Sequence, residues 1–283
     1  MLAADFKEHL ENSLNAKILQ AKPLTGGDIN EALLLTTAAG NRVIKLNDKD
    51  KFPKMFAREA EGLQLLATTK TFQVPEVHLH GEWEHQSYLV MEYIPQGREK
   101  DDFWALFGKN LAKLHRNSRS QFGLHYDNYI GSLPQYNTAK TDAAEFYITQ
   151  RLEPQFKIAA EGGYSFDNIS AFYKKTEAII PKEPSGLIHG DLWSGNYLVN
   201  TLGEPALIDP AVSFAPREMD IGLMHLFGGF DESLYDSYNQ IYPLSDGWQE
   251  RTKLWQLYYV LVHVNLFGGG YYASAKGIMK NYL

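Results

Sequence analysis

Cysteine is absent from the 283 residues of this chain. Its absence excludes disulfide bonds, zinc sites built on thiolates and catalysis by a thiol nucleophile. Proteins without disulfides are typical of reducing compartments, so we expect a cytoplasmic protein. For the same reason, any oligomer of this chain cannot be a disulfide-linked dimer.

Basic segments and long apolar segments are also lacking. Asp and Glu outnumber Lys and Arg by 34 to 27, which gives a net charge of −7 and argues against a nucleic-acid partner. No stretch approaches the roughly 18 uncharged apolar residues of a membrane-spanning helix. The first residues carry Asp5, Lys7 and Glu8, where the core of a signal peptide would be uncharged. We therefore expect no membrane partner.

The segment from Ile188 to Asn196, with the sequence IHGDLWSGN, carries the strongest chemical signal. Asp191 and Asn196 are five residues apart between two short apolar runs, and a later apolar run ends in Asp209. One Asp in a loop is usually a turn residue, but this ordered set is the polar layout of a kinase catalytic loop. It makes Asp191 the catalytic base that accepts a hydroxyl proton. Asn196 and Asp209 then hold Mg²⁺ on the phosphates of ATP.

Lys45 is the expected cation on those phosphates. It follows Val43 and Ile44 on a predicted strand, the context of a phosphate-binding kinase lysine. Most strand lysines simply face solvent, so the downstream motif supports this interpretation. Glu59, fourteen residues on in a predicted helix, is the expected ion-pair partner. Glu61 lies about 200° round that helix from Glu59 and would face away.

Other nucleotide contacts are less specific. Gly26 and Gly27 would let backbone N–H groups approach the phosphates, although two glycines equally fit an ordinary hairpin turn. Main-chain groups of Glu92 and Tyr93 are the candidates for adenine, and the alternative is a buried strand end. These four residues complete the predicted nucleotide-binding set.

The hydrophobic pattern changes near Pro95-Gln96-Gly97. Before this point we expect a helix over 5–14, strands over 32–37 and 42–46, a helix over 53–68, and strands over 76–81 and 87–92. After it helical patterns dominate, starting with an apolar face over 103–114. We predict an α+β, bilobal protein-kinase-like fold. An antiparallel-sheet nucleotide-binding lobe would cover residues 1–93, and a helical lobe with the catalytic loop and substrate site residues 94–283.

Four residues are candidates for contact with a substrate. Trp193 lies inside the catalytic loop, where its ring would pack either against a substrate or in the core. Asp127, Asn128 and Arg151 offer polar groups to a polyhydroxylated molecule, or they connect loops of the helical lobe. Because buried polar groups usually serve the backbone, the second role is favoured for Asn128 and Arg151. Asp220 is expected to brace the catalytic loop.

The chain resembles the fructosamine kinase (ketosamine-3-kinase) family, within the aminoglycoside-phosphotransferase-like branch of the protein-kinase-like fold. The resemblance rests on segments 189–196, 207–211, 127–137 and 151–155, and it extends over nearly the whole chain. It implies Mg²⁺- and ATP-dependent phosphorylation of the sugar 3-hydroxyl of ketoamines: fructosamines, ribulosamines and erythrulosamines, on small molecules or proteins. Some members have a redox-active cysteine in the glycine-rich loop. This chain has Asp28 in that region and cannot use such a switch.

Two other functions stay open at this stage. One is another small-molecule kinase of the superfamily, acting on an aminoglycoside, choline or homoserine. The other is a non-catalytic ATP-binding scaffold on a kinase fold. Scaffolds of this kind usually lose the base, a metal ligand or the lysine, and this chain keeps all of them.

Overall fold

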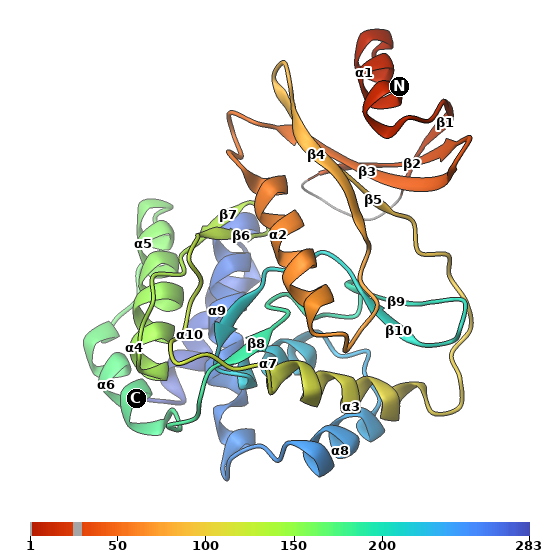
Figure 1. The fold of residues 1–283 in the computed structure, drawn as a ribbon. Helices are drawn as coiled ribbons and strands as arrows, with labels where there is room; N and C mark the ends of the chain where they lie inside the picture. Colours follow the sequence, from red (N-terminus) through yellow and green to blue (C-terminus); the bar gives the residue numbers. More distant parts are fainter. Residues whose placement is uncertain (1, 25–29) are drawn as a thin grey trace. The chain divides into compact units, whose positions relative to one another are not determined.

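The structure is a computed structural model that describes residues 2–24 and 30–283 (Figure 1). The chain divides into two compact units. One consists of Met1–Glu99 and Leu198–Asp209, and the other of Lys100–Tyr197 and Pro210–Leu283. None of the helices formed by the described residues has the length and apolar character needed to cross a membrane.

An antiparallel five-stranded sheet forms the centre of the first unit. Its strands are β1 (Ile18–Pro23), β2 (Glu31–Thr37), β3 (Gly40–Asp48), β4 (Val77–Trp83) and β5 (Gln86–Glu92). They are arranged in the order β1-β2-β3-β5-β4, and every neighbouring pair is antiparallel. The sequence predicted β2 to β5 to within two residues at each end, because apolar residues and turn signals alternate regularly there.

Two helices cover opposite faces of this sheet (Figure 1). The helix α1 (Ala4–Leu14) packs Phe6 and Leu10 against a cluster that includes Ile44 of β3. The helix α2 (Met55–Thr68) packs against the other face, together with Val43. Because strand side chains alternate, Lys45 projects to the same face as Val43 and towards α2.

A short hairpin from the later part of the chain completes the first unit. It consists of β9 (Tyr197–Val199) and β10 (Pro205–Leu207). The Leu207 amide donates to the Gln73 carbonyl at 2.9 Å, and the Gly97 amide donates to the Val199 carbonyl at 2.8 Å. These main-chain bonds bring the segment that ends at Asp209 into the same unit as Lys45.

The second unit is built around α9 (Trp248–Phe267), whose middle part from Leu254 to Val264 is mostly buried in the apolar core. Helices α5, α7 and α10 pack against it. Its further helices are α3 (Phe103–His115), α4 (Ala143–Tyr147), the π-helical turn η1 (Ile148–Leu152), α5 (Glu153–Glu161), α6 (Ile169–Ile179), α7 (Glu218–Phe227), α8 (Glu232–Ile241) and α10 (Gly270–Lys280). Its short strands are β6 (Asn128–Ile130), β7 (Leu133–Gln135), β8 (Gly186–Ile188) and β11 (Ser213–Ala215).

The contact between α3 and α8 depends on a glycine. A Cβ atom at Gly108 would lie 2.0 Å from the carbonyl oxygen of Leu234, so only glycine allows this approach. The apolar face predicted for α3, at Phe103, Phe107 and Leu111, is fully buried. The sequence identified that face, but it gave no indication that α8 would cover it.

Candidate active site

Lys45 in the first unit is held by two carboxylates. Its ammonium lies 2.5 Å from Glu59 Oε1 and 2.7 Å from Asp209 Oδ1, and its side chain is 8% exposed. The strand β3 supplies the lysine, α2 supplies Glu59 and the chain after β10 supplies Asp209. The predicted pair of Lys45 with Glu59 therefore forms, and Asp209 joins it.

The charges of this cluster alter one another. Burial alone would lower the pKa of Lys45, but the carboxylates of Asp209 and Glu59 outweigh it and raise that pKa above its ordinary value. Burial raises the pKa of Glu59, which the lysine opposes and Asp209 reinforces. The ammonium stays charged at neutral pH, as a group that binds phosphates requires.

Asp209 has an uncommon backbone conformation. Its φ of 55° lies in the left-handed region, where Asp is tolerated better than most residues. Its side chain remains 40% exposed while one oxygen accepts from Lys45. The carboxylate is thus accessible for a cation, and a carboxylate oxygen is the ligand type that Mg²⁺ prefers.

Asp191 and Asn196 lie together in the second unit, in the loop that follows β8. The Asn196 side-chain amide donates to the Asp191 carbonyl at 2.8 Å and to the Asp191 carboxylate at 3.0 Å. Asn196 is 6% exposed. Its amide N–H groups are directed at Asp191, and an amide carbonyl oxygen is a group that can bind a cation.

Asp220 fixes the backbone at the start of this loop. This fully buried carboxylate on α7 accepts the backbone N–H groups of His189 and Gly190, each at 2.8 Å. His115 Nε2 donates to it at 3.2 Å, and His115 Nδ1 accepts from the Tyr238 hydroxyl at 2.9 Å. Two backbone groups next to Asp191 are therefore fixed by one side chain.

Sequence reasoning missed His115. It lies at the end of α3, 105 positions from Asp220, and no local pattern sets it apart from a surface histidine. Burial lowers the pKa of His115, against the opposing hydrogen bond to Asp220. The neutral imidazole can donate from Nε2 and accept at Nδ1, which matches its two partners.

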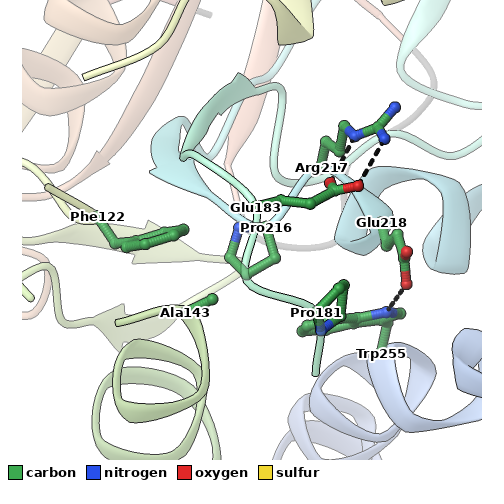
Figure 2. Close-up of a pocket in the computed structure, with 8 residues that line it drawn as sticks. All are labelled: Phe122, Ala143, Pro181, Glu183, Pro216, Arg217, Glu218 and Trp255. Carbon is green, nitrogen blue, oxygen red and sulfur yellow. Dashed lines mark hydrogen bonds and ion pairs between the residues drawn. The ribbon is translucent and has the colours of Figure 1, made fainter. Parts of the chain in front are cut away.

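A small pocket lies beside the first residue of α7 (Figure 2). It is lined by Phe122, Ala143, Pro181, Glu183, Pro216, Arg217, Glu218 and Trp255. Its charged groups already have partners, because Arg217 forms two bonds of 2.8 Å with Glu183. Glu218 accepts from Trp255 Nε1 at 2.7 Å and from Arg251 Nη2 at 2.6 Å. These pairs fix the beginning of the helix that carries Asp220.

Trp193 is exposed in the catalytic loop, at 40% of its surface. Its ring covers Gly195, where a Cβ atom would lie 2.2 Å from the indole. The ring centre lies 6.2 Å from that of Phe227, which in turn lies 5.2 Å from His263. His263 continues this aromatic row to Tyr271 at 4.9 Å. The ring position is compatible with contact to a substrate.

Asp127, Asn128 and Arg151 lie close to one another. Asp127 is exposed, and its carboxylate accepts the Asn137 backbone N–H at 2.7 Å. Asn128 is 5% exposed and donates to the Val212 carbonyl at 3.0 Å. Arg151 is fully buried. The side chains of Asn128 and Arg151 donate hydrogen bonds to other segments of the second unit. This is the alternative role, in which they connect loops of the helical lobe.

Two of the remaining residues predicted to contact the nucleotide lie at the end of β5. Glu92 ends β5, and its backbone N–H donates to the Glu76 carbonyl at 2.8 Å. Tyr93 follows it and is partly buried. Gly26 and Gly27 lie outside the described residues.

The fold class is that of the protein-kinase-like phosphotransferases. An aminoglycoside phosphotransferase crystallised with AMP-PNP and hygromycin B superposes with a TM-score of 0.65, at 16% identity and 99% coverage of both chains. At this identity the similarity establishes the fold alone, and it confirms the predicted α+β protein-kinase-like architecture.

The fructosamine kinase family model matches residues 2–283, and the chain belongs to this family. A Synechocystis protein assigned as a ketoamine kinase is 38% identical over 270 residues, covering 94% of this chain and 91% of that protein. The chloroplastic protein-ribulosamine 3-kinase of Arabidopsis thaliana is 39% identical, with coverages of 91% and 81%. A crystal structure assigned as a fructosamine-3-kinase, from Haemophilus somnus, has a TM-score of 0.90 at 28% identity, with coverages of 98% and 96%.

Proposed function

We propose that this protein transfers the γ-phosphoryl group of ATP to the sugar 3-hydroxyl of ketoamines. One observation carries the proposal: the complete set of kinase groups is present in a chain that matches the fructosamine kinase family over 2–283. Relatives named for ketoamines and for ribulosamines on proteins support this substrate class. The partner is then a ketoamine, either free or attached to a protein.

Asp191 is the proposed catalytic base. Its carboxylate accepts the proton of the sugar hydroxyl while the hydroxyl oxygen forms a bond to the γ-phosphorus. The bond from that phosphorus to the β–γ bridging oxygen breaks, and ADP leaves. Asn196 and the backbone bonds to Asp220 keep the carboxylate in position, which matters because phosphoryl transfer depends mainly on positioning and electrostatics.

The first unit is proposed as the nucleotide-binding lobe. Lys45, aimed by Glu59, neutralises charge on the phosphates. We assign backbone contacts with the phosphates to Gly26 and Gly27, and contacts with adenine to main-chain groups near Glu92 and Tyr93. The Glu92 N–H is occupied by Glu76, so the Glu92 carbonyl and the groups of Tyr93 are the relevant ones.

Asn196 and Asp209 are the proposed ligands of Mg²⁺. Both offer oxygen atoms, and Mg²⁺ in kinases is typically held by one or two such side chains together with substrate phosphates. When bound, the ion neutralises charge that develops on the transferred phosphoryl group. The exposed carboxylate of Asp209 and the amide geometry of Asn196 fit this role.

Trp193 is the proposed platform for the substrate. Its exposed ring lies two residues from Asp191, and aromatic rings bind both sugar faces and protonated amines. A ketoamine contains both groups. For Asp127 a polar contact with the same substrate is proposed, whereas Asn128 and Arg151 are assigned to the internal network described below.

We further propose that the protein acts in the cytoplasm, as expected of a chain without cysteine. The relative from Arabidopsis is named as chloroplastic.

Turnover of Mg·ATP with ribulosyl-, erythrulosyl- and fructosyl-lysine tests the proposal. We expect ketoamine-dependent release of ADP, and a kcat lower by about 10³-fold in Asp191→Asn, because general-base catalysis contributes on that order. Asp236→Asn, an exposed change on α8, is the matched control. If no ketoamine stimulates turnover although ATP binds, the substrate class is wrong and aminoglycosides and amino alcohols replace it. ATP binding without turnover of any acceptor in either panel would favour the non-catalytic ATP-binding scaffold.

A further inference from the structure

Arg151 is a buried cation that forms no ion pair with a carboxylate of the described residues, although the charge of Asp127 acts on it. It lies in η1, a single π-helical turn between α4 and α5, and its side chain has no exposed surface. Its guanidinium carbon lies 4.6 Å from the ring centre of Phe146 and 5.6 Å from that of Tyr258. π-Helical turns are rare, and those that occur are often found at functional sites. Burying an arginine without an ion-pair partner also costs free energy.

The hydrogen bonds of Arg151 go to neutral acceptors. Nη1 donates to the carbonyls of Tyr136 and Gln150, and Nη2 donates to Asn137 Oδ1 at 2.9 Å and Ser213 Oγ at 3.1 Å. Nε has no partner among the described residues. The arginine thus joins three separate segments through one planar group.

The bonds continue through a buried amide network. Asn137 donates to Asn128 Oδ1 at 2.8 Å, and Gln135 donates to the same oxygen at 2.9 Å. The Tyr258 hydroxyl donates to Gln135 Oε1 at 2.8 Å. Arg151, Asn137, Asn128, Gln135 and Tyr258 are therefore one connected group, which we call the Arg151 network.

Three consecutive residues are the common target of this network. Gln135 donates to the Ala211 carbonyl at 3.0 Å and Asn128 to the Val212 carbonyl at 3.0 Å, while Arg151 bonds the Ser213 hydroxyl. The segment Ala211–Ser213 follows directly on Asp209-Pro210 in the chain. Each of its residues is held by a different member of the network.

The same segment touches the catalytic loop within the second unit. The Ala211 N–H donates to the His189 carbonyl at 2.9 Å, and β11 pairs Ser213 with Ile188 of β8. A Cβ atom at Gly190, whose φ is +83°, would lie 2.0 Å from the Ala211 carbonyl oxygen. Any shift of the segment would therefore move the residues that precede Asp191.

We propose that Arg151 is a positioning residue for phosphoryl transfer, which acts through Ser213 and the Arg151 network to fix Ala211–Ser213 against the catalytic loop. This inference rests on the proposed function. The planar fork of arginine bonds the Tyr136, Asn137 and Ser213 acceptors at once, and the compact ammonium of a lysine cannot span them. The proposed role therefore depends on the planar shape of the guanidinium as well as on its charge.

The test compares Arg151→Lys, Ser213→Ala and the double variant with the wild-type enzyme. Nucleotide titration counts the binding-competent sites, and kcat is expressed per such site. We expect Arg151→Lys to lower kcat on the order of 100-fold, because small displacements of reacting groups cost about that much. The Kd of ATP should stay within about threefold. Ser213→Ala should lower kcat about tenfold, as loss of one hydrogen bond to a charged group does.

The double variant separates positioning from general destabilisation. If Arg151 acts through Ser213, the double variant should be about as slow as Arg151→Lys alone, because the two changes remove one interaction. Multiplying effects would overturn the proposal. The proposal would also be overturned if Arg151→Lys kept a kcat per site within about threefold of wild type. If Arg151→Lys does not fold, the same criterion applies to Ser213→Ala.

Gln155→Ala provides the matched control. This side chain on α5 is also buried, its Oε1 accepts from Asn265 Nδ2 at 2.7 Å, and among the described residues it forms no bond with the Ala211–Ser213 segment. We expect a comparable fall in Tm with kcat per site nearly unchanged, and an equal loss of kcat would overturn the proposal. The ratios can be measured with any alcohol acceptor that the wild type phosphorylates. Failure of ketoamines alone therefore contradicts only the proposed function.

Discussion

The Lys45 ammonium lies 2.7 Å from a carboxylate oxygen of Asp209, 164 positions further along the chain. The same ammonium lies 2.5 Å from Glu59. One buried cation thus compensates two carboxylates. Bound phosphates would have to share this cation with both side chains, which makes the cluster sensitive to the loss of any one member.

Replacement of Lys45 by Met should affect both activity and folding. We expect kcat/KM for ATP to fall by more than about 100-fold, because the phosphates lose the cation proposed to bind them. The free energy of unfolding should fall by about 3 kcal/mol, since two carboxylates are left without it. Coupled-enzyme kinetics and urea denaturation measure the two effects. Lys49→Met is the control, because Lys49 lies 3.6 Å from an exposed carboxylate of Glu82; equal losses in both variants would contradict the assignment.

Asp209→Asn and Asn196→Ala should raise the Mg²⁺ concentration needed for half-maximal rate by about tenfold or more, because each removes an oxygen, or its charge, from the proposed ligands of the ion. Initial rates measured against free Mg²⁺ at saturating ATP give this concentration. Asp231→Asn leaves an N-cap residue in place at α8 and should not change it. An unchanged Mg²⁺ dependence in both test variants would exclude them as ligands.

Trp193→Ala should raise KM for a ketoamine about tenfold and leave KM for ATP nearly constant. The reason is that its exposed ring is the proposed platform for the sugar and the protonated amine. Steady-state kinetics with each substrate varied in turn provide the measurement. Leu202→Ala removes another exposed apolar side chain, 65% exposed, and should change neither constant. A selective rise in KM for ATP would assign the ring to the nucleotide instead.

Acid should destabilise the protein partly through His115. Burial lowers the pKa of His115 in the folded protein, so at low pH the unfolded chain binds a proton that the folded one does not. This contribution to stability is complete above the unfolded pKa of about 6.5 and is lost as the pH falls below it. Urea denaturation between pH 7.5 and 5 should show a smaller decline in the free energy of unfolding for His115→Gln than for wild type.

His85→Gln is the control for that measurement, because the His85 side chain is 89% exposed. Its decline should match that of wild type. If the free energy of unfolding of His115→Gln falls as steeply with decreasing pH as that of wild type and of His85→Gln, the buried imidazole does not contribute to the pH dependence.

The regular elements near the N-terminus were accessible from sequence because their signals are local. Strand β5, predicted over 87–92, is found at Gln86–Glu92, and the helix predicted over 53–68 is found at Met55–Thr68. Alternating or helically spaced apolar residues bounded by turn residues specify such elements without knowledge of their partners. The π-helical turn that carries Arg151 has no such signal, since it differs from an α-helix only in hydrogen-bond spacing.

The sequence by itself determined the kind of chemistry. The primary structure alone sets the spacing of Asp191, Asn196 and Asp209. It also sets the apolar residues that precede Lys45, and neither feature depends on the tertiary structure. The partner of Lys45 was also predictable, because Glu59 lies on the next helix and only one helical face can point to the sheet.

Only the tertiary structure decided how the catalytic loop is supported. The sequence suggested Asp220 as a brace, and the structure shows that Asp220 accepts two backbone N–H groups before Asp191. The structure alone identified His115 as a partner of Asp220, and Arg151 as a partner of a segment 60 positions and more away. These contacts join residues from distant parts of the chain, and the burial that makes them selective exists only once the core has formed. Residue types and spacing name the reacting groups, whereas packing decides which polar side chains hold them in place.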